Sequence, residues 1–166
     1  MAVIRRAAEG DIAALLDLRI ANRAYLERWE PDTKPPGRRY TREYYEEWMK
    51  SEDQFVVLDG DAIAGTVQLV HGGWDALSSA MVGYWIAEQH AGKRLATRAV
   101  QAILDVAFVE RGFHRVEAGT AVENVASQRV LEHNGFTRVG LLRAHLLIGG
   151  EWRDHYLYET LADDPR

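Results

Sequence analysis

One segment in the middle of the chain limits the possible folds more than any other. A strand-like run at residues 80–87 passes through a turn at Gly92 into a helical pattern, and a second strand-like run follows at residues 115–121. Gly112 lies where a glycine is expected after the end of a helix. A strand–helix–strand unit predicts a sheet whose strands are not all antiparallel. The apolar face of its helix is predicted to consist of Leu95, Ala99, Ala102, Ile103, Val106 and Val109.

The segments on either side of this unit have the pattern of antiparallel hairpins. Asp59-Gly60-Asp61 and Gly149-Gly150 each separate two strand-like runs, as tight hairpin turns do. The sequence therefore predicts an α+β (mixed α/β) fold, with a mostly antiparallel mixed sheet of about seven strands and helices on both faces. We expect one domain over residues 1–166. The expected strands are residues 3–6, 54–58, 63–70, 80–87, 115–121, 139–148 and 151–161.

Capping residues predict the remaining helices. Asp11, Thr41 and Asn124 each precede a helical pattern, and their side chains can accept a hydrogen bond from its first turn. The helix after Asn124 is expected to end at Asn134-Gly135. Residues 31–39 hold three prolines and a glycine, so they are predicted to form a loop, and we expect it to act as a lid. The buried faces are predicted to be Ile12, Leu15, Leu16 and Ile20 in the first helix, and Tyr45, Trp48 and Met49 in the second.

Composition and motifs exclude several classes of function. The chain has no cysteine, so disulfides, thiolate catalysis and zinc–cysteine sites are excluded. Its net charge of -5 counts against a general nucleic-acid binder. No apolar run is long enough to span a membrane and no signal peptide is evident, so we expect a cytoplasmic protein. No metal site is expected, and the common phosphate-loop and serine-elbow motifs are absent.

The turn at Gly92 has two interpretations that its residues alone leave equal. The free backbone N–H groups at the start of a helix, with the helix dipole, can hold a pyrophosphate, and a glycine lets phosphate oxygens approach closely. Lys93, Arg94 and Arg98 add positive charge nearby. Alternatively, Gly92 only begins the helix.

Five segments taken together resemble a known superfamily. They are Gly83-Tyr84-Trp85-Ile86-Ala87, Gly92-Lys93-Arg94-Leu95-Ala96-Thr97, Asn124-Val125-Ala126-Ser127, Val130-Leu131-Glu132-His133-Asn134-Gly135-Phe136, and the residues from Leu146 to His155. In this order and spacing the chain resembles the GNAT acyl-CoA N-acyltransferases. Within them it is most similar to the RimJ/RimL type, which acetylates the N-termini of ribosomal proteins. The resemblance covers nearly the whole chain and is strongest from Gly83 onward.

The resemblance implies a binding site for acetyl-CoA, which serves as co-substrate without a metal. The strand ending at Ile86-Ala87 is expected to pair with the pantetheine arm, in a slot made by two splayed central strands. Residues 92–97 are expected to hold the pyrophosphate through backbone N–H groups, Asn124 to contact the pantetheine, and Ser127 to lie near the thioester sulfur. The cofactor-binding residues implied are Trp85, Ile86, Ala87, Gln89, Gly92, Lys93, Arg94, Leu95, Ala96, Thr97, Asn124 and Ser127.

Two residues depart from the pattern of the superfamily. Arg94 stands where a second small residue is usual, so we expect the pyrophosphate contacts to come from the backbone, with this side chain turned away or resting on a phosphate. Leu131 stands where many relatives have a tyrosine general acid. Ser127 is the substitute in the RimL-like branch, and its alternative role is that of a serine that only helps to cap a helix.

The implied reaction is direct attack of an amine on the thioester, through a tetrahedral intermediate stabilised by backbone N–H groups of residues 85–87. An α-amine has a pKa of about 7.7–8.0 and a lysine side chain about 10.4, so an α-amine needs less help from a base. Glu88 is the first candidate base, and His71 and His145 are weaker ones. Ser127 is expected to protonate the departing thiolate.

The expected acceptor is the N-terminal α-amine of a protein or peptide. The alternatives are a small amine, such as a polyamine, amino sugar or antibiotic, and a non-catalytic acyl-CoA sensor on the same scaffold. No nucleic-acid or membrane partner is expected, and the resemblance allows a homodimer. The candidate wall residues of the acceptor site are Tyr25, Trp29, Tyr40, Trp74 and Trp152.

Overall fold

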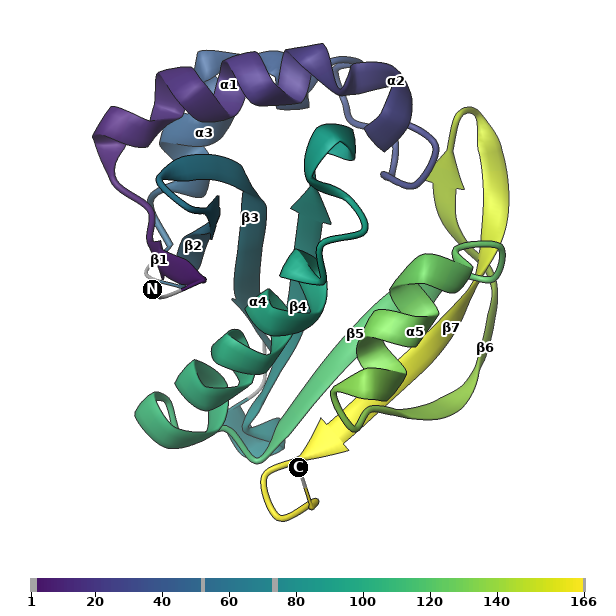
Figure 1. The fold of residues 1–166 in the computed structure, drawn as a ribbon. Coiled ribbons are helices and arrows are strands. Elements are labelled where there is room, and N and C mark those ends of the chain that lie inside the picture. The colour runs from purple at the N-terminus through teal and green to yellow at the C-terminus, as the bar shows by residue number, and fades with distance from the viewer. Residues whose placement is uncertain (1–2, 52, 73–74, 166) are drawn as a thin grey trace.

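The computed structural model describes residues 3–51, 53–72 and 75–165. Their strands form one mixed sheet in the order β1-β2-β3-β4-β5-β7-β6, and Figure 1 shows it running through the middle of the molecule. The α+β fold with about seven strands and helices on both faces is therefore confirmed. The strands are β1 (Ile4–Arg6), β2 (Gln54–Asp59), β3 (Ala62–His71), β4 (Ser79–Ile86), β5 (Arg115–Ala121), β6 (Thr137–Ile148) and β7 (Glu151–Leu161).

The parallel pair β4 and β5 lies at the centre of the sheet and separates along its length. The two strands pair only where Ser79, Ala80 and Met81 face Arg115, Val116 and Glu117. Beyond this point they diverge, as Figure 1 shows, while β4 stays paired with β3 and β5 with β7. The divergence leaves the facing edges of both strands without a strand partner, so their backbone groups are available to another extended chain.

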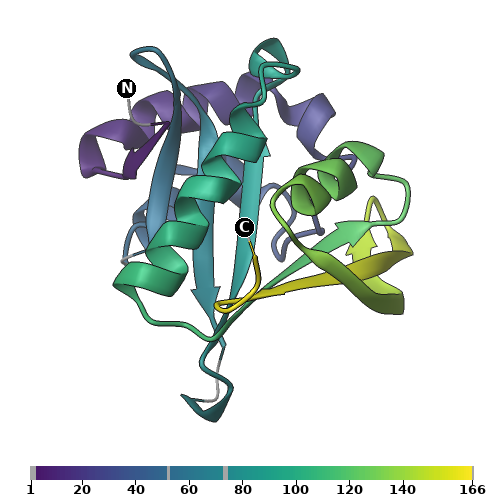
Figure 2. The same cartoon turned by 60° about the horizontal axis from the view of Figure 1, so that its bottom comes forward.

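Helices cover both faces of the sheet because neighbouring residues of β2 point to opposite sides. Phe55 and Val57 pack in the core beneath α4 (Leu95–Asp105), whereas Val56 packs against α1 (Ile12–Ala21) and α3 (Arg42–Trp48). Figure 2 shows α4 in front of the sheet and α1 behind it. The fifth helix, α5 (Val125–His133), lies beside β5 on the same side as α4, and the short α2 (Arg23–Leu26) follows α1.

The first helix differs from the prediction at both ends. Asp11 makes no side-chain bond to the first turn of α1. Its carboxylate instead accepts hydrogen bonds from the Ala8 backbone N–H and from Arg5, which closes the preceding 3₁₀ turn. Ile20 is 51% exposed and Arg19 is buried in its place. At about 100° per residue, position 19 lies close to the stripe of Ile12, whereas position 20 is turned about 80° from it.

The predicted apolar face of α4 is correct as far as Val106, but Val109 is 78% exposed. A π-helical turn (Val106–Glu110) follows α4 and is wider than an α-helical turn. It rotates Val109 into solvent and brings Ala107 into the core in its place. Gly112 adopts a φ of +66° after this turn, as expected for a residue that ends a helix.

The other predicted helix caps are confirmed. Thr41 accepts a hydrogen bond from the Tyr44 N–H, and Asn124 accepts one from the Ser127 N–H. The predicted turn at Gly149-Gly150 has positive φ at both residues and joins β6 to β7. Within the described residues, no helix is long and apolar enough to cross a membrane.

Candidate functional site

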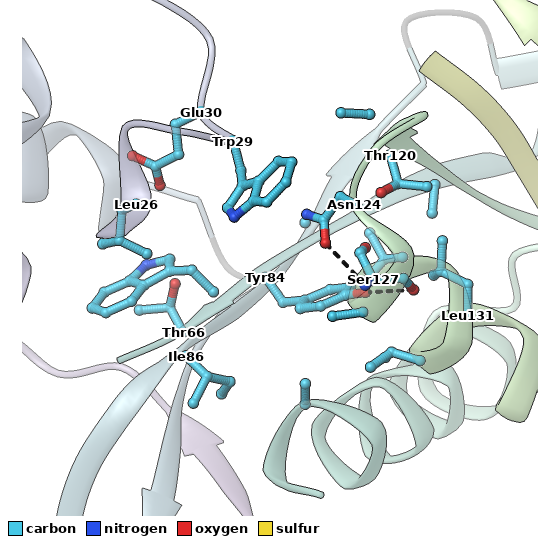
Figure 3. Close-up of a pocket in the computed structure, with 18 of the residues that line it drawn as sticks. Leu26, Trp29, Glu30, Thr66, Tyr84, Ile86, Thr120, Asn124, Ser127 and Leu131 are labelled. Carbon is cyan, nitrogen blue, oxygen red and sulfur yellow. Dashed lines mark hydrogen bonds between the residues drawn. The ribbon is translucent and has the colours of Figure 1, made fainter. Parts of the chain in front are cut away.

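A cavity of about 1090 Å³ lies where β4 and β5 diverge. This is at the upper end of the size of small-molecule sites, enough for a long ligand. Figure 3 shows its two walls. After the roles expected from the sequence, we call the wall formed by β5, α5 and the start of α4 the cofactor half, and the wall formed by α1, α2, the loop after α2, and α3 the acceptor half. Tyr84 and Trp85 of β4 lie between the two halves.

The glycine turn forms one end of the cofactor half. Gly92 has a φ of +76°, and a Cβ built there meets nothing within 4 Å, so the glycine is required by conformation rather than by crowding. Arg94 is the N-cap of α4, has a left-handed φ of +58° and makes no side-chain bond to the helix. The N–H groups of the first turn of α4 therefore have no capping side chain. Gly92, Arg94, Leu95, Ala96 and Thr97 all line the cavity.

The turn is fastened to the hairpin between β2 and β3. Asp59 accepts hydrogen bonds from Lys93 Nζ at 2.6 Å and from His90 Nδ1 at 2.7 Å. These bonds, first that from Lys93, hold the pKa of Asp59 below its usual value. The ammonium group of Lys93 is thus engaged by the hairpin, and Lys93 is not among the residues that line the cavity. Arg94 is therefore the cation of this turn that faces the cavity.

Ser127 lies at the centre of the cofactor half. Its N–H donates to Asn124 Oδ1 at 3.1 Å, and its Oγ is 2.8 Å from the hydroxyl of Tyr84, as Figure 3 shows. Burial raises the pKa of Tyr84 to about 12, so its hydroxyl stays protonated at neutral pH. Leu131 is fully buried in the same wall. The phenol of Tyr84, which comes from β4, thus stands beside the serine.

Thr120 of β5 is a buried polar residue without a partner. It is 4% exposed and lines the cavity, yet its Oγ1 has no hydrogen bond. An unsatisfied buried hydroxyl costs about 1–3 kcal/mol, and this oxygen is sealed from the cavity. Figure 3 places Thr120 beside Asn124. Together with the open edges of β4 and β5 and the uncapped start of α4, the side chain of Asn124 fits an extended ligand with amide groups and a pyrophosphate, as in acyl-CoA.

A buried ion pair lies in the acceptor half. Arg19 is 3% exposed and pairs with Glu30, and its guanidinium stacks 5.0 Å from the centre of the Trp85 ring. Tyr45 contributes its hydroxyl at 3.5 Å from Arg19. The pair neutralises its own charge and fixes the orientation of Trp85, one of the residues expected to contact the cofactor. Trp29 and Glu30 face the cofactor half across the cavity in Figure 3.

The mouth of the acceptor half carries aromatic rings and arginines. Tyr25 and Trp29 line it, and the guanidinium of Arg28 stacks over both rings, at 5.0 and 5.9 Å from their centres. Arg39 also lines the cavity and donates to the carbonyl of Pro31. Neither Arg28 nor Arg39 has a carboxylate partner within the described part of the chain. These two arginines therefore give the mouth an uncompensated positive charge.

The predicted loop at residues 31–39 is held against the last hairpin. Asp32 accepts hydrogen bonds from the N–H groups of Gly149 and Gly150 at 2.8 and 2.9 Å, and its own N–H donates to the carbonyl of Leu147 at 2.8 Å. The loop thus connects the acceptor half to the tip of β6 and β7. Tyr40, at the end of this loop, lines a smaller adjoining cavity of about 320 Å³ instead of the main one.

Other predicted site residues lie outside the wall of the main cavity. Glu88 is exposed, and its backbone N–H donates to Asn22 Oδ1 at 2.8 Å. His71 pairs with Asp53 at the opposite end of β3. His145 is exposed, and Trp152 is 65% exposed on β7. Ala87 and Gln89 are likewise not among the lining residues, and Trp74 lies outside the described residues.

Several cavity residues were not predicted as functional. Arg19 and Glu30 belong to separate segments, and only the fold brings them together. Thr120 and His155 lie inside strands, and the strand pattern of the sequence does not distinguish them from their neighbours. Tyr84 belongs to a quoted motif, but nothing in the motif indicates that its hydroxyl meets Ser127. The one available signal was the position of Arg19, seven residues after Ile12 on a stripe that is otherwise apolar.

Comparisons with known proteins agree over nearly the whole chain. Residues 2–137 match the family model of an acetyltransferase (GNAT) domain. The chain is 38% identical to a probable N-acetyltransferase of Bacillus subtilis, YjcK, over 76% of this chain and 72% of that protein. It is 29% identical to the ribosomal protein uS5-alanine N-acetyltransferase of Escherichia coli, over 98% and 88%. The structure of Mycobacterium smegmatis RimJ in complex with CoA-disulfide matches with a TM-score of 0.83 at 32% identity, over 96% and 81%.

Proposed function

Because the chain belongs to the GNAT family of acetyltransferases, and so transfers an acetyl group from acetyl-CoA to an amine, we propose that this amine is the N-terminal α-amine of a protein or peptide. The relative from Escherichia coli is named for an alanine of ribosomal protein uS5, and the match covers 98% of the present chain. A newly made cytoplasmic protein is the acceptor that this proposal implies.

The positive charge of the acceptor half distinguishes a peptide acceptor from a polyamine. Arg28 and Arg39 line it without a carboxylate partner, and Glu30 is already paired with Arg19. A polyamine would bring further positive charges next to these arginines, and like charges at close range are unfavourable. A peptide presents backbone carbonyl oxygens, which arginine side chains bind well. The mouth therefore favours a peptide over a polycation.

The chemistry of the site agrees with an acceptor of modest basicity. Acetyl-CoA supplies an activated acetyl group and is released as the thiol. Ser127 holds a proton at Oγ for the sulfur, and the hydroxyl of Tyr84 lies 2.8 Å from that Oγ. Ala87 N–H is bonded to the carbonyl of Ala64 at 2.8 Å. N–H groups alternate sides along an antiparallel strand, so Trp85, which faces Thr66, also points its N–H to β3. The Ile86 N–H is therefore the remaining donor of this segment for the developing oxyanion.

A thiol-release assay with matched acceptors tests the proposal. We expect an Ala- or Ser-initiated peptide to react faster than spermidine or free lysine, with mass spectrometry placing the acetyl group on the α-nitrogen. The same peptide with a blocked N-terminus is the control and should not react. Faster turnover with spermidine, or an acetyl group on a lysine side chain, would refute the proposed acceptor.

The role of Ser127 needs a separate experiment. Ser127→Ala should slow turnover and leave CoA binding intact, because the backbone N–H that bonds Asn124 is unchanged. Calorimetric titration with CoA checks the binding. Unchanged turnover would remove Ser127 from the mechanism.

A further inference from the structure

We propose that His155 is the general base of this enzyme, and that its Nε2 takes the proton from the acceptor amine. The proposal rests on the proposed amine acetylation, but not on which amine is used. Of the two histidines on the last hairpin, His155 is 3% exposed and lines the cavity. Its neighbour His145, with ring centres 5.5 Å apart, is exposed and does not.

The position of His155 follows from the register of the sheet. It lies on β7, opposite Ala121 of β5 on one side and Leu142 of β6 on the other. Ala121 also lines the cavity, at the end of β5 that has diverged from β4. His155 therefore stands at the wide end of the slot between β4 and β5. Glu88, the base expected from the sequence, is an exposed residue outside the lining.

Hydrogen bonding fixes which ring nitrogen can act. His155 Nδ1 is 3.1 Å from the carbonyl oxygen of Arg153. A carbonyl oxygen only accepts, so Nδ1 carries the hydrogen of the neutral ring and Nε2 carries the lone pair. Nε2 makes no hydrogen bond within the described residues and is not one of the sealed, unsatisfied buried atoms. A lone pair that meets the cavity and has no partner is what a base requires.

The surroundings keep the ring neutral. Burial lowers the pKa of His155 most, the hydrogen bond to the Arg153 carbonyl opposes it, His145 lowers the pKa further, and Glu123 and Asp154 oppose by less, so that the pKa stays below its usual value. A histidine has an ordinary pKa of about 6.5, so His155 is unprotonated at pH 7 and ready to accept a proton. One oxygen of the Asp154 carboxylate is already hydrogen-bonded, because Oδ1 accepts from the Ala144 N–H at 2.7 Å.

The protons balance as follows. An acceptor that arrives as an ammonium ion gives one proton to His155 Nε2, which later passes it to solvent. As the bond from nitrogen to the acetyl carbon forms and the carbon–sulfur bond breaks, Ser127 gives its hydroxyl proton to the sulfur. Ser127 then regains a proton lost by the new amide nitrogen, through solvent. The products are the acetylated amine, the CoA thiol and one free proton.

The test uses His155→Asn, because an asparagine amide can keep the bond to the Arg153 carbonyl while Nε2 is removed. His145→Asn is the matched control on the neighbouring strand. We expect His155→Asn to lower kcat by roughly 10²-fold or more, with CoA affinity and thermal midpoint close to those of the wild type. The part of the fall in kcat/KM at acidic pH that follows a group titrating below about 6.5 should disappear in His155→Asn, which leaves the titration of the acceptor amine, and it should persist in His145→Asn.

A measurement on the free wild-type protein covers the case in which the variant does not fold. Long-range ¹H–¹⁵N NMR with ¹⁵N-histidine should show His155 protonated at Nδ1 at pH 7 and titrating below about 6.5. A ring protonated at Nε2, or charged at pH 7, would overturn the proposal, as would a His155→Asn enzyme with wild-type kcat at every pH. A wild-type protein that acetylates no amine would instead refute the proposed function.

Discussion

Replacement of Gly65 by alanine should displace the β4 backbone that lines the cavity. Gly65 lies on β3 opposite Ile86 of β4. A Cβ built on Gly65 would stand 3.0 Å from Ile86 Cα and 3.0 Å from the carbonyl carbon of Trp85, and closer still to the Trp85 carbonyl oxygen. Carbon atoms in contact are normally about 3.5–4.0 Å apart. The backbone of residues 85 and 86 must therefore move by at least about 0.5 Å.

This movement should lower both the unfolding free energy and kcat. Overpacking of a sheet interior typically costs about 1–3 kcal/mol, and the atoms in the way are backbone, which cannot turn aside as a side chain can. The displaced Ile86 N–H is the one proposed to face the oxyanion, and a misplacement of about 1 Å in an active site can cost about 10²-fold in rate. We therefore expect Gly65→Ala to lose about 1–3 kcal/mol of unfolding free energy and about 10–100-fold in kcat.

Urea unfolding and a thiol-release assay measure the two effects. Gly140→Ala is the control, because Gly140 also lies in a strand and a Cβ there meets nothing within 4 Å. Gly65→Ala should be worse than Gly140→Ala in both measurements. If the two variants had equal stability and equal kcat, the close approach of β4 to Gly65 would have no role in the site and the reasoning would be wrong.

Three further predictions concern buried charges and polar groups. Thr120→Val should stabilise the protein by about 1 kcal/mol in urea unfolding, because it removes an unsatisfied hydroxyl, and an unchanged stability would contradict this. Glu30→Gln should cost about 3 kcal/mol, since the charge of Arg19 then stays buried alone, and a loss under about 1 kcal/mol would contradict this. Burial raises the pKa of Asp53, but hydrogen bonds from an arginine and a histidine bring it below its usual value. The stabilising effect of the Asp53 carboxylate is therefore complete above pH ~4 and is lost as the pH falls through the pKa of Asp53 in the folded protein. Asp53→Asn should flatten the acid side of a stability–pH curve measured by urea unfolding. An unchanged curve would contradict this prediction.

The elements of the fold could be predicted because their signals are local. Thr41 and Asn124 cap helices through bonds to residues three positions away, and the turn at Gly149-Gly150 depends on two adjacent φ angles. The failures at Ile20 and Val109 have different origins. The prediction for Ile20 followed the apolar residue type, although a regular 3.6-residue period places Arg19 on the buried stripe. The prediction for Val109 extended that period through a π-helical turn.

The cofactor half could be expected from contiguous motifs, whereas the acceptor half could not. Gly92 and the residues after it are neighbours in the sequence, so their order alone suggested a cradle. Arg19 and Glu30 meet through the fold, and the partners of Tyr84 and His155 come from other segments. Their types are also common in ordinary helices and strands. A polar residue gains its role here from burial and from a missing partner, and neither can be read from one sequence.

The bonds of Asp32 to the last hairpin have a consequence for how the protein is made. Its partners Gly149 and Gly150 lie 117 and 118 residues later in the chain. In the turn at Gly92, in contrast, His90 and Lys93 bond to Asp59, which lies only 31 and 34 positions earlier in the chain. During synthesis the turn can thus settle well before the acceptor wall, which must wait for the final hairpin to leave the ribosome. A growing chain would complete the turn that we propose binds the acetyl donor before the wall that we propose receives the acceptor.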